Sequence, residues 1–191
     1  MPEPSNYKLI GAVIEASVAN DWYSAVREWE IVDMEEDERC EQGCVCGHEH
    51  LRYLFTLRNR LNGNELYPIG NICIKKFERD DLDSELRARM QAIKLAQTAN
   101  ALGTGGQVEL KGGSFTRDLI NYMRDEGAFP DNKYNYWDGD NDGRFLLDMF
   151  NKRGDLTERQ GKKVYAVIRN AVYPWLRGVW RDTHNGQAPR F

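Results

Sequence analysis

The fold of the N-terminal part of this chain is decided by two stretches, Cys44-Val45-Cys46-Gly47-His48 and Gly70-Asn71-Ile72-Cys73. Together they hold three thiols and an imidazole in two short turns. Thiolate sulfur and imidazole nitrogen are donors that suit Zn²⁺, which structural sites hold in a tetrahedron of four such ligands. The segment between the stretches is long enough for a β-hairpin. The sequence therefore predicts a zinc site that ties the two stretches together.

Four residues are the expected zinc ligands: Cys44, Cys46, His48 and Cys73. The fourth position is open to alternatives, because Cys40 and His50 also offer sulfur or nitrogen nearby. Four protein ligands would make the site structural, whereas three would leave a place for water and allow a catalytic zinc. Cysteine-rich ligation favours the structural site. The competing interpretation is that the thiols are ordinary small buried hydrophobic residues.

Length and composition describe a folded protein of one or two domains. The chain has 191 residues, of which 41% are hydrophobic, and this apolar content is enough to offset the entropy of ordering. The first residues lack the basic and apolar regions of a secretory signal, and no apolar run reaches the about 20 residues that span a bilayer. We therefore expect a cytoplasmic protein without a membrane segment. In that reducing compartment, clustered thiols are more often metal ligands than disulfides.

Local patterns predict the elements of an N-terminal α+β module at residues 1–80. Asn20-Asp21 can cap a helix that runs through Trp29, and residues 7–14 fit either a strand or a short buried helix. Asn62-Gly63 is a strong turn signal, so a hairpin is expected there. The strands expected in this module are residues 30–34, 51–58 and 65–69.

The rest of the chain, residues 81–191, is expected to be mainly helical. A helical spacing of apolar residues covers 81–102, and Thr157-Glu158-Arg159-Gln160 has the form of a capping box. Pro174 is expected to kink or end the last helix. The predicted fold class is thus α+β, with a zinc-stabilised β-hairpin module and an N-terminal helix followed by a mainly helical C-terminal half.

Charge is segregated along the chain despite a net charge of only −4. The predicted hairpin module carries a basic set that could contact nucleic acid: Arg52, Arg58, Arg60, Lys75 and Lys76. The run Glu35-Glu36-Asp37-Glu38 precedes the first metal stretch. Such runs are usually solvated turns, and the alternative is an acidic face offered to a basic partner.

Three other patterns point only weakly to a ligand. Residues 138–143 copy the opening of an EF-hand loop, but the twelfth position is Met149 where calcium needs a bidentate carboxylate. The glycine-rich breaks at 103–106 and 112–114 lack the order of a P-loop, so they do not indicate nucleotide binding. The aromatic residues of Tyr134-Asn135-Tyr136-Trp137 could stack on single-stranded nucleic acid. Its phosphate groups would be contacted by the basic side chains of Arg159, Lys162, Lys163 and Arg169. The commoner alternative is that these aromatic residues cap a helical core.

The metal stretches and the predicted hairpin resemble small zinc-binding proteins of bacteriophages, prophages and other mobile elements. The shared features are a C-x-C-G turn, a hairpin, and an I-G-x-x-C knuckle before a phenylalanine, here Phe77. Residues 22–31, 151–153 and 156–160 also look like elements of that group, so the resemblance covers about half of the chain. It implies a metal-stabilised fold and says little of activity, because most such proteins have none assigned. Cys40 is an extra thiol that the group's pattern does not require.

The leading functional hypothesis is a non-enzymatic, zinc-binding protein of phage or prophage type that binds nucleic acid or a host nucleoprotein complex. The alternative is a protein-protein inhibitor of a host defence system, such as an anti-CRISPR or related anti-defence factor, which would act through the acidic N-terminal region. A third class is a zinc hydrolase or nuclease, which would need an open metal position and a general base such as Glu49. No serine-based or histidine-based nucleophile is visible.

Overall fold

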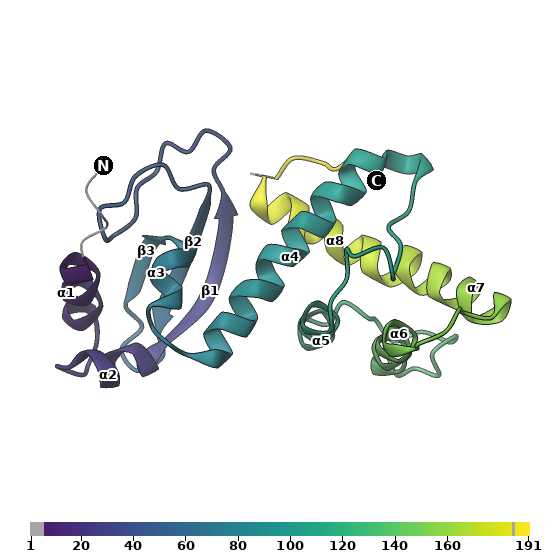
Figure 1. Ribbon diagram of the computed structural model, residues 1–191, viewed down its shortest axis with the longest axis horizontal. Helices are drawn as coiled ribbons and strands as arrows, with labels where there is room; N and C mark the ends of the chain where they lie inside the picture. The colour runs from purple at the N-terminus through teal and green to yellow at the C-terminus, as the bar shows by residue number, and fades with distance from the viewer. Residues whose placement is uncertain (1–5, 185) are drawn as a thin grey trace. The chain divides into compact units, whose positions relative to one another are not determined.

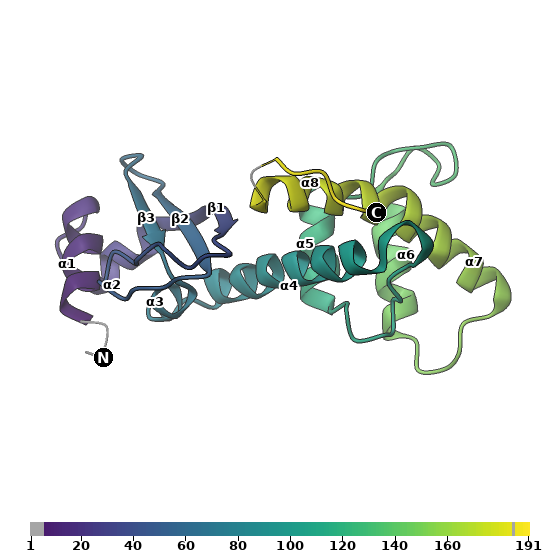
Figure 2. The ribbon, with the colours of Figure 1, turned by 90° about the horizontal axis from the view of Figure 1, so that it is seen from above.

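The computed structural model describes residues 6–184 and 186–191, and the chain divides into two compact units (Figures 1 and 2). The first unit ends at Leu86 and the second runs from Arg87 to Phe191. The expected boundary between residues 80 and 81 falls at the start of helix α4 (Asp80–Leu102), whereas the division by contacts falls inside that helix. The fold is α+β, as predicted, with a three-stranded sheet followed by a mainly helical half.

The sheet of the first unit is antiparallel, with the strand order β1-β2-β3 (Figure 1). Its strands are β1 (Trp29–Glu36), β2 (Tyr53–Asn59) and β3 (Glu65–Ile69). The hairpin between β2 and β3 is confirmed, and β3 has the bounds expected from the sequence. Alternate β2 side chains such as Phe55 and Leu57 are fully buried because this sheet face packs into the core.

Short helices surround this sheet: α1 (Asn6–Ala16), α2 (Trp22–Ala25), the 3₁₀ turn η1 (Val26–Glu28) and α3 (Asn71–Lys75). The Asp21 cap is confirmed, since its carboxylate accepts the Ser24 N–H at 3.0 Å. The prediction of a helix through Trp29 is wrong. Trp29 starts β1 opposite Asn59, and its indole N–H donates to Ser17 Oγ at 2.9 Å. Helical spacing of aromatic residues could not reveal this long-range pairing.

The second unit packs its helices around one apolar core. After α4 and the 3₁₀ turn η2 (Gly103–Gly105), its elements are α5 (Arg117–Asp125), α6 (Asp140–Asn151), α7 (Glu158–Val167), the π-helical segment η3 (Ile168–Val172) and α8 (Tyr173–Thr183). The capping box at Thr157 and Gln160 is confirmed. Fully buried side chains from α5, α6 and α8 meet in this core, among them Leu119, Leu146 and Leu176. None of the helices within the described ranges is long and apolar enough to span a bilayer.

Pro174 was expected to kink or end the last helix, and it does not end the helical run. It lies in the first turn of α8, directly after the π-helical segment η3. A proline in a regular helix clashes with the carbonyl group four residues earlier and lacks an N–H donor. The wider turn of η3 offers room for the ring, so the chain continues as a helix.

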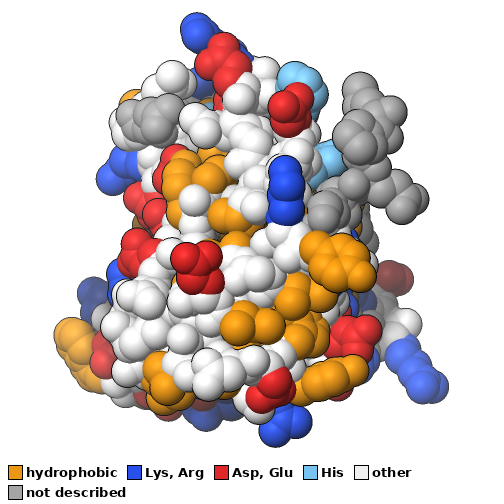
Figure 3. All heavy atoms as spheres, turned by 90° about the vertical axis from the view of Figure 1, so that its left-hand side faces the viewer, with side chains coloured by type: hydrophobic (Ala, Val, Ile, Leu, Met, Phe, Trp, Pro, Cys, Tyr) orange, Lys and Arg blue, Asp and Glu red, His pale blue; other side chains and the backbone are white. Residues whose placement is uncertain are grey.

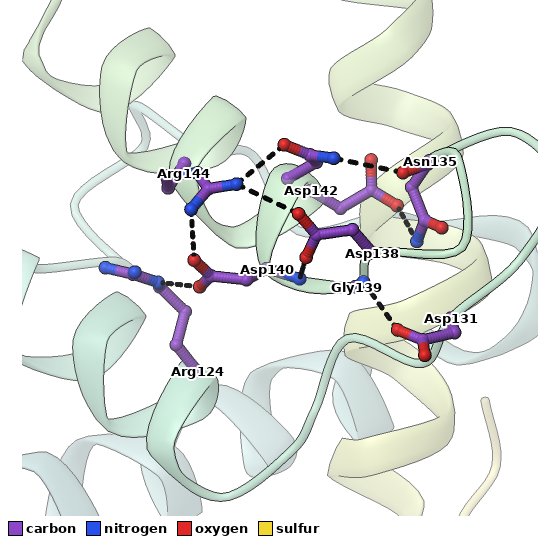
Figure 4. Close-up of polar contacts among 9 residues, drawn as sticks. Arg124, Asp131, Asn135, Asp138, Gly139, Asp140, Asp142 and Arg144 are labelled. Atoms are coloured by element: carbon purple, nitrogen blue, oxygen red, sulfur yellow. Dashed lines mark hydrogen bonds and ion pairs between the residues drawn. The ribbon is translucent and has the colours of Figure 1, made fainter.

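The aspartate-rich loop before α6 is used for internal contacts and does not have the form of an EF-hand (Figure 4). α6 begins at Asp140, so most of the would-be calcium loop is helical. The Asp140 carboxylate accepts from Arg124 and from Arg144, each at 2.7 Å, and Arg144 also reaches Asp138 at 3.1 Å. The Arg124 guanidinium holds the pKa of Asp140 below its usual range. These contacts leave the carboxylates in poor positions to surround a cation.

Candidate metal centre

Three of the predicted ligands converge in the first unit. The sulfur atoms of Cys44, Cys46 and Cys73 all lie within 4.8 Å of one another, and all three residues are buried. Cys44 and Cys46 come from the loop between β1 and β2, and Cys73 comes from α3. Residues that are far apart in sequence therefore meet at one point, as the two stretches predicted.

The first stretch forms a tight turn that points its sulfur atoms inward. Gly47 has a φ of +86°, which favours glycine, and its N–H donates to the Cys44 carbonyl at 2.7 Å. The Cys44 N–H in turn donates to the carbonyl of His48 at 2.7 Å. The Val45 N–H donates to the carbonyl of Pro68 at 2.9 Å, which fixes the turn to strand β3.

Gly70 packs closely against Leu51 at this site. The sequence suggested a tight turn, but its φ of −83° is ordinary. A Cβ atom at Gly70 would lie 2.9 Å from Leu51 Cδ2, a contact that is too close without a shift. The small residue lets Leu51 cover the site. Ile74 and Phe77, which follow Cys73 in the chain, are also buried.

The thiols are electrostatically prepared for a cation. The sulfur atoms of Cys44 and Cys73 lie 3.6 Å apart and share a hydrogen bond, and the Gly70 N–H donates to the Cys44 sulfur at 3.4 Å. The Cys73 hydrogen bond is the largest reason that the pKa of Cys44 falls to about 5. The pKa of Cys73 is raised by the same hydrogen bond and by burial. A buried thiolate is costly unless a positive charge lies beside it, and a metal ion supplies that charge.

The group of three thiols includes none of the candidates for the fourth ligand, His48, His50 and Cys40. His48 is exposed, but it lines the same pocket of about 190 Å³ as Cys44 and Cys73. His50 lines that pocket too, and its Nδ1 contacts the Cys40 carbonyl at 3.1 Å. The Cys40 thiol donates to the carbonyl of Asp37 at 3.6 Å instead. Histidine side chains are visible at the surface in Figure 3. The choice of His48 stays a prediction.

Most of the predicted nucleic-acid-binding residues have partners inside the first unit. Arg52 pairs with Glu36 and Arg58 pairs with Glu65, both at 2.8 Å, yet these guanidinium side chains are 58% and 51% exposed. The others lie in three settings: Arg60 donates to the Arg27 carbonyl, Lys76 donates to Asn6, and Lys75 is exposed. The basic set is thus at the surface, and carboxylates pair with two of its five members, Arg52 and Arg58.

The acidic run is partly used to build the loop that holds the thiols. The Asp37 carboxylate accepts the backbone N–H groups of Arg39, Glu41 and Gln42, at distances of 2.7–3.1 Å. Glu36 is buried in its pair with Arg52. Glu38 is exposed, and so is Glu49, the proposed general base of the hydrolase hypothesis.

The structure contradicts one of the two interpretations of the aromatic residues between α5 and α6, the one in which they cap a helical core. Their side chains do not cap the core: Tyr134 is 79%, Tyr136 is 86% and Trp137 is 71% exposed. The flanking Asp and Asn residues were the sequence signal for this exposure. Such residues favour turns, and side chains in turns often lie outside the core.

The three thiols, their burial and the distances between them are observed directly in this chain. Nothing in them depends on a relative, and the metal assignment therefore rests on donor chemistry and geometry. No family model matches the chain, and neither the curated proteins nor the solved structures yielded a match.

Proposed function

We propose that this chain is a non-enzymatic zinc-binding protein that binds single-stranded nucleic acid, alone or within a nucleoprotein complex. Zn²⁺ held by Cys44, Cys46, Cys73 and His48 would fix the loop and α3 of the first unit. Thiolates also suit Cu(I) and iron–sulfur clusters. A set of three thiolates and one imidazole that fills a tetrahedron favours zinc. Such a site contributes to folding and leaves no open position for catalysis.

The observation that carries the nucleic-acid proposal is the exposed aromatic loop, defined as residues 131–139. Its three exposed rings, those of Tyr134, Tyr136 and Trp137, offer flat faces to solvent. Bases of a single strand stack on such rings irrespective of sequence, and each stack contributes about 1–3 kcal/mol. Large exposed aromatic residues in an ordered loop otherwise cost solubility without benefit.

Hydrogen bonds of Asn135 fix the backbone of the loop, and its contact with Asp142 is drawn in Figure 4. Asn135 is buried, and its amide donates to Asp142 Oδ2 and to the Pro130 carbonyl, each at 3.0 Å. Tyr136 and Trp137 have φ values of +62° and +59°, which are unusual for bulky residues. Backbone strain of this kind persists only where surrounding contacts enforce it, and it is concentrated at functional sites. The loop is therefore preorganised for a partner.

Charge near the loop is compatible with a phosphate backbone. Two aspartates in or beside the loop have cationic neighbours, since Arg144 pairs with Asp138 and Lys163 lies 3.6 Å from Asp142 in α6. Lys133 lies 5.0 Å from the centre of the Tyr134 ring, where it can meet a phosphate group. On the first unit, the pair of Arg58 with Glu65 is exposed on both sides, and such a surface ion pair is weak enough to exchange a carboxylate for a phosphate.

The defence-inhibitor alternative has less support. It needs an acidic face, and two residues of the acidic run, Glu36 and Asp37, are engaged in the fold. A zinc hydrolase has less support still, because the thiol group is buried.

The nucleic-acid proposal predicts a large loss of affinity when one exposed ring is removed. For Trp137→Ala we expect the dissociation constant for a fluorescently labelled single-stranded oligonucleotide to rise about 5- to 100-fold, because one base loses its stacking partner. Fluorescence anisotropy at low salt measures it. Tyr23→Ala is the matched control, because Tyr23 is 78% exposed and belongs to α2 of the first unit rather than to the loop.

Affinity should also fall steeply as salt rises from about 50 to 200 mM, because phosphate contacts release counterions. Equal binding by Trp137→Ala and Tyr23→Ala would contradict the assignment of the loop. Wild-type protein that binds no oligonucleotide at low salt would contradict nucleic-acid binding itself.

A further inference from the structure

The two units of this chain carry opposite net charges. The first unit, which ends at Leu86, has nine Lys and Arg residues against 18 Asp and Glu residues, a net charge of −9. The second unit, from Arg87 to Phe191, has 17 Lys and Arg residues against 12 Asp and Glu residues, a net charge of +5. The small net charge of the whole chain therefore hides one strongly acidic unit and one basic unit.

This difference in charge bears on where a nucleic-acid strand can bind. A strand is a polyanion, so the second unit attracts it and the first unit repels it. The basic set of the hairpin module belongs to the first unit, where acidic residues outnumber basic ones by two to one. An exchange of Glu65 for a phosphate at Arg58 would have to occur against the field of that whole unit. The charges therefore favour phosphate contacts on the second unit.

Two polar contacts within the second unit link helix α7 to the aromatic loop. Lys163 Nζ of α7 lies 3.6 Å from Asp142 Oδ1 and 4.4 Å from the centre of the Phe145 ring. The other carboxylate oxygen of Asp142 accepts the side-chain amide of Asn135 at 3.0 Å (Figure 4). Asn135 is the buried residue between two exposed tyrosines of the loop. The basic side chains of α7 and the rings of the loop thus belong to neighbouring parts of one unit.

The exposed face of α7 combines basic side chains with a further aromatic ring. Lys162 pairs with Glu158 at 2.6 Å, and these side chains are 76% and 83% exposed. Such an exposed pair is weak, so its carboxylate can give way to a phosphate. The ring of Tyr165 is 50% exposed, and its hydroxyl accepts a hydrogen bond from Arg169 at 3.0 Å. Steps of three and four residues separate these positions, so Tyr165 lies between Lys162 and Arg169 on one helical face.

We propose that a single strand of nucleic acid runs from the aromatic loop onto α7, where Lys162 and Lys163 contact its phosphates and Tyr165 stacks on a further nucleobase. Basic side chains that follow the backbone, together with rings that stack on nucleobases, are how proteins hold single strands irrespective of sequence. The acidic first unit takes no part in this contact. The inference rests on the proposed binding of single-stranded nucleic acid and adds where the strand lies.

The salt dependence of binding by the full chain tests the phosphate contacts. On a single strand, each contact contributes about 0.7 to the slope of log affinity against log salt concentration. For the double variant Lys162→Gln/Lys163→Gln we expect this slope to fall by about 1.4, and the dissociation constant at about 50 mM salt to rise about 10- to 100-fold. Fluorescence anisotropy with a labelled single-stranded oligonucleotide measures both. Lys162→Gln alone keeps the contact of Lys163 with Asp142 and should lower the slope by about 0.7.

The matched control is Arg58→Gln/Lys75→Gln, which removes the same amount of charge from exposed residues of the first unit. Its slope should equal that of the wild type. Thermal unfolding identifies any variant that has lost its fold. Equal reductions of the slope in the two double variants, or an unchanged slope in folded Lys162→Gln, would overturn the proposal.

Tyr165→Ala tests the additional stacking position. We expect its dissociation constant to rise about 5- to 100-fold, whereas Tyr165→Phe keeps the ring and should bind as the wild type does. If Trp137→Ala loses affinity while Tyr165→Ala and the lysine variants bind normally, the loop binds the strand without α7 and only this inference fails. Wild-type protein that binds no strand would remove both proposals.

Discussion

Cys73→Ser is expected to abolish stoichiometric zinc binding and to unfold the first unit. Cys73 supplies one of three buried sulfur atoms, and it alone of the three comes from α3. A serine hydroxyl is a poor zinc ligand, so the tetrahedron loses a corner. Structural zinc supplies on the order of 10 kcal/mol in small zinc folds, which exceeds the stability of many whole domains. Metal analysis and circular dichroism of the purified variant measure both effects.

Cys40→Ser is the control for this variant. Cys40 is a half-buried thiol outside the group of three, so its loss should leave zinc content and melting unchanged. Two further variants, His48→Ala and His50→Ala, separate the candidates for the fourth ligand. Only His48→Ala should weaken zinc binding. Normal zinc content and normal melting in Cys73→Ser would contradict the metal centre.

Gly139→Ala is expected to destabilise the second unit by about 3 kcal/mol or more, a large effect for one methyl group. A Cβ at this position would lie only 1.8 Å from the carbonyl oxygen of Phe129, and backbone cannot move aside as a side chain can. The cause is steric rather than conformational, since Gly139 has an ordinary helical φ of −59°. Urea denaturation, followed through the transition of the second unit, measures the loss.

The matched control for this prediction is Gly161→Ala. Gly161 lies inside α7, and a Cβ there would meet no atom within 4 Å. Alanine is the better helix former, so we expect this variant to be unchanged or more stable by about 0.5–1 kcal/mol. Similar stabilities for Gly139→Ala and Gly161→Ala would show that Gly139 is not packed against Phe129 as described.

Local signals in the sequence predicted the elements that depend on neighbours along the chain. The turn at Asn62-Gly63, the return strand 65–69 and the capping box at Thr157 were all expected, because each rests on a few adjacent residues. Trp29 was misassigned because its place in β1 depends on Asn59, far away in sequence. The exposure of Tyr136 likewise depends on its buried neighbour Asn135. The side-chain amide of Asn135 donates hydrogen bonds to Pro130 and Asp142, and no rule of residue spacing predicts these contacts.

The candidate site shows the same difference between what local spacing predicts and what depends on residues distant in the sequence. Spacing was enough to select the three thiols, since two stretches with metal-ligand patterns must meet if a metal holds them. It was not enough to show that Arg52 and Arg58 pair with glutamates, because those partners come from neighbouring strands. Spacing also did not reveal that Lys163 lies beside Asp142, because that contact depends on how α7 packs against α6.

The central claim is that one metal ion joins the residue 44–46 turn to α3 and so stabilises the first unit. The most direct test is metal analysis of freshly purified protein, combined with thermal unfolding before and after treatment with a strong chelator. We predict about one zinc per chain and loss of the first unit's unfolding transition when zinc is removed. Protein that contains no stoichiometric zinc, or that melts identically with and without chelator, would contradict the account.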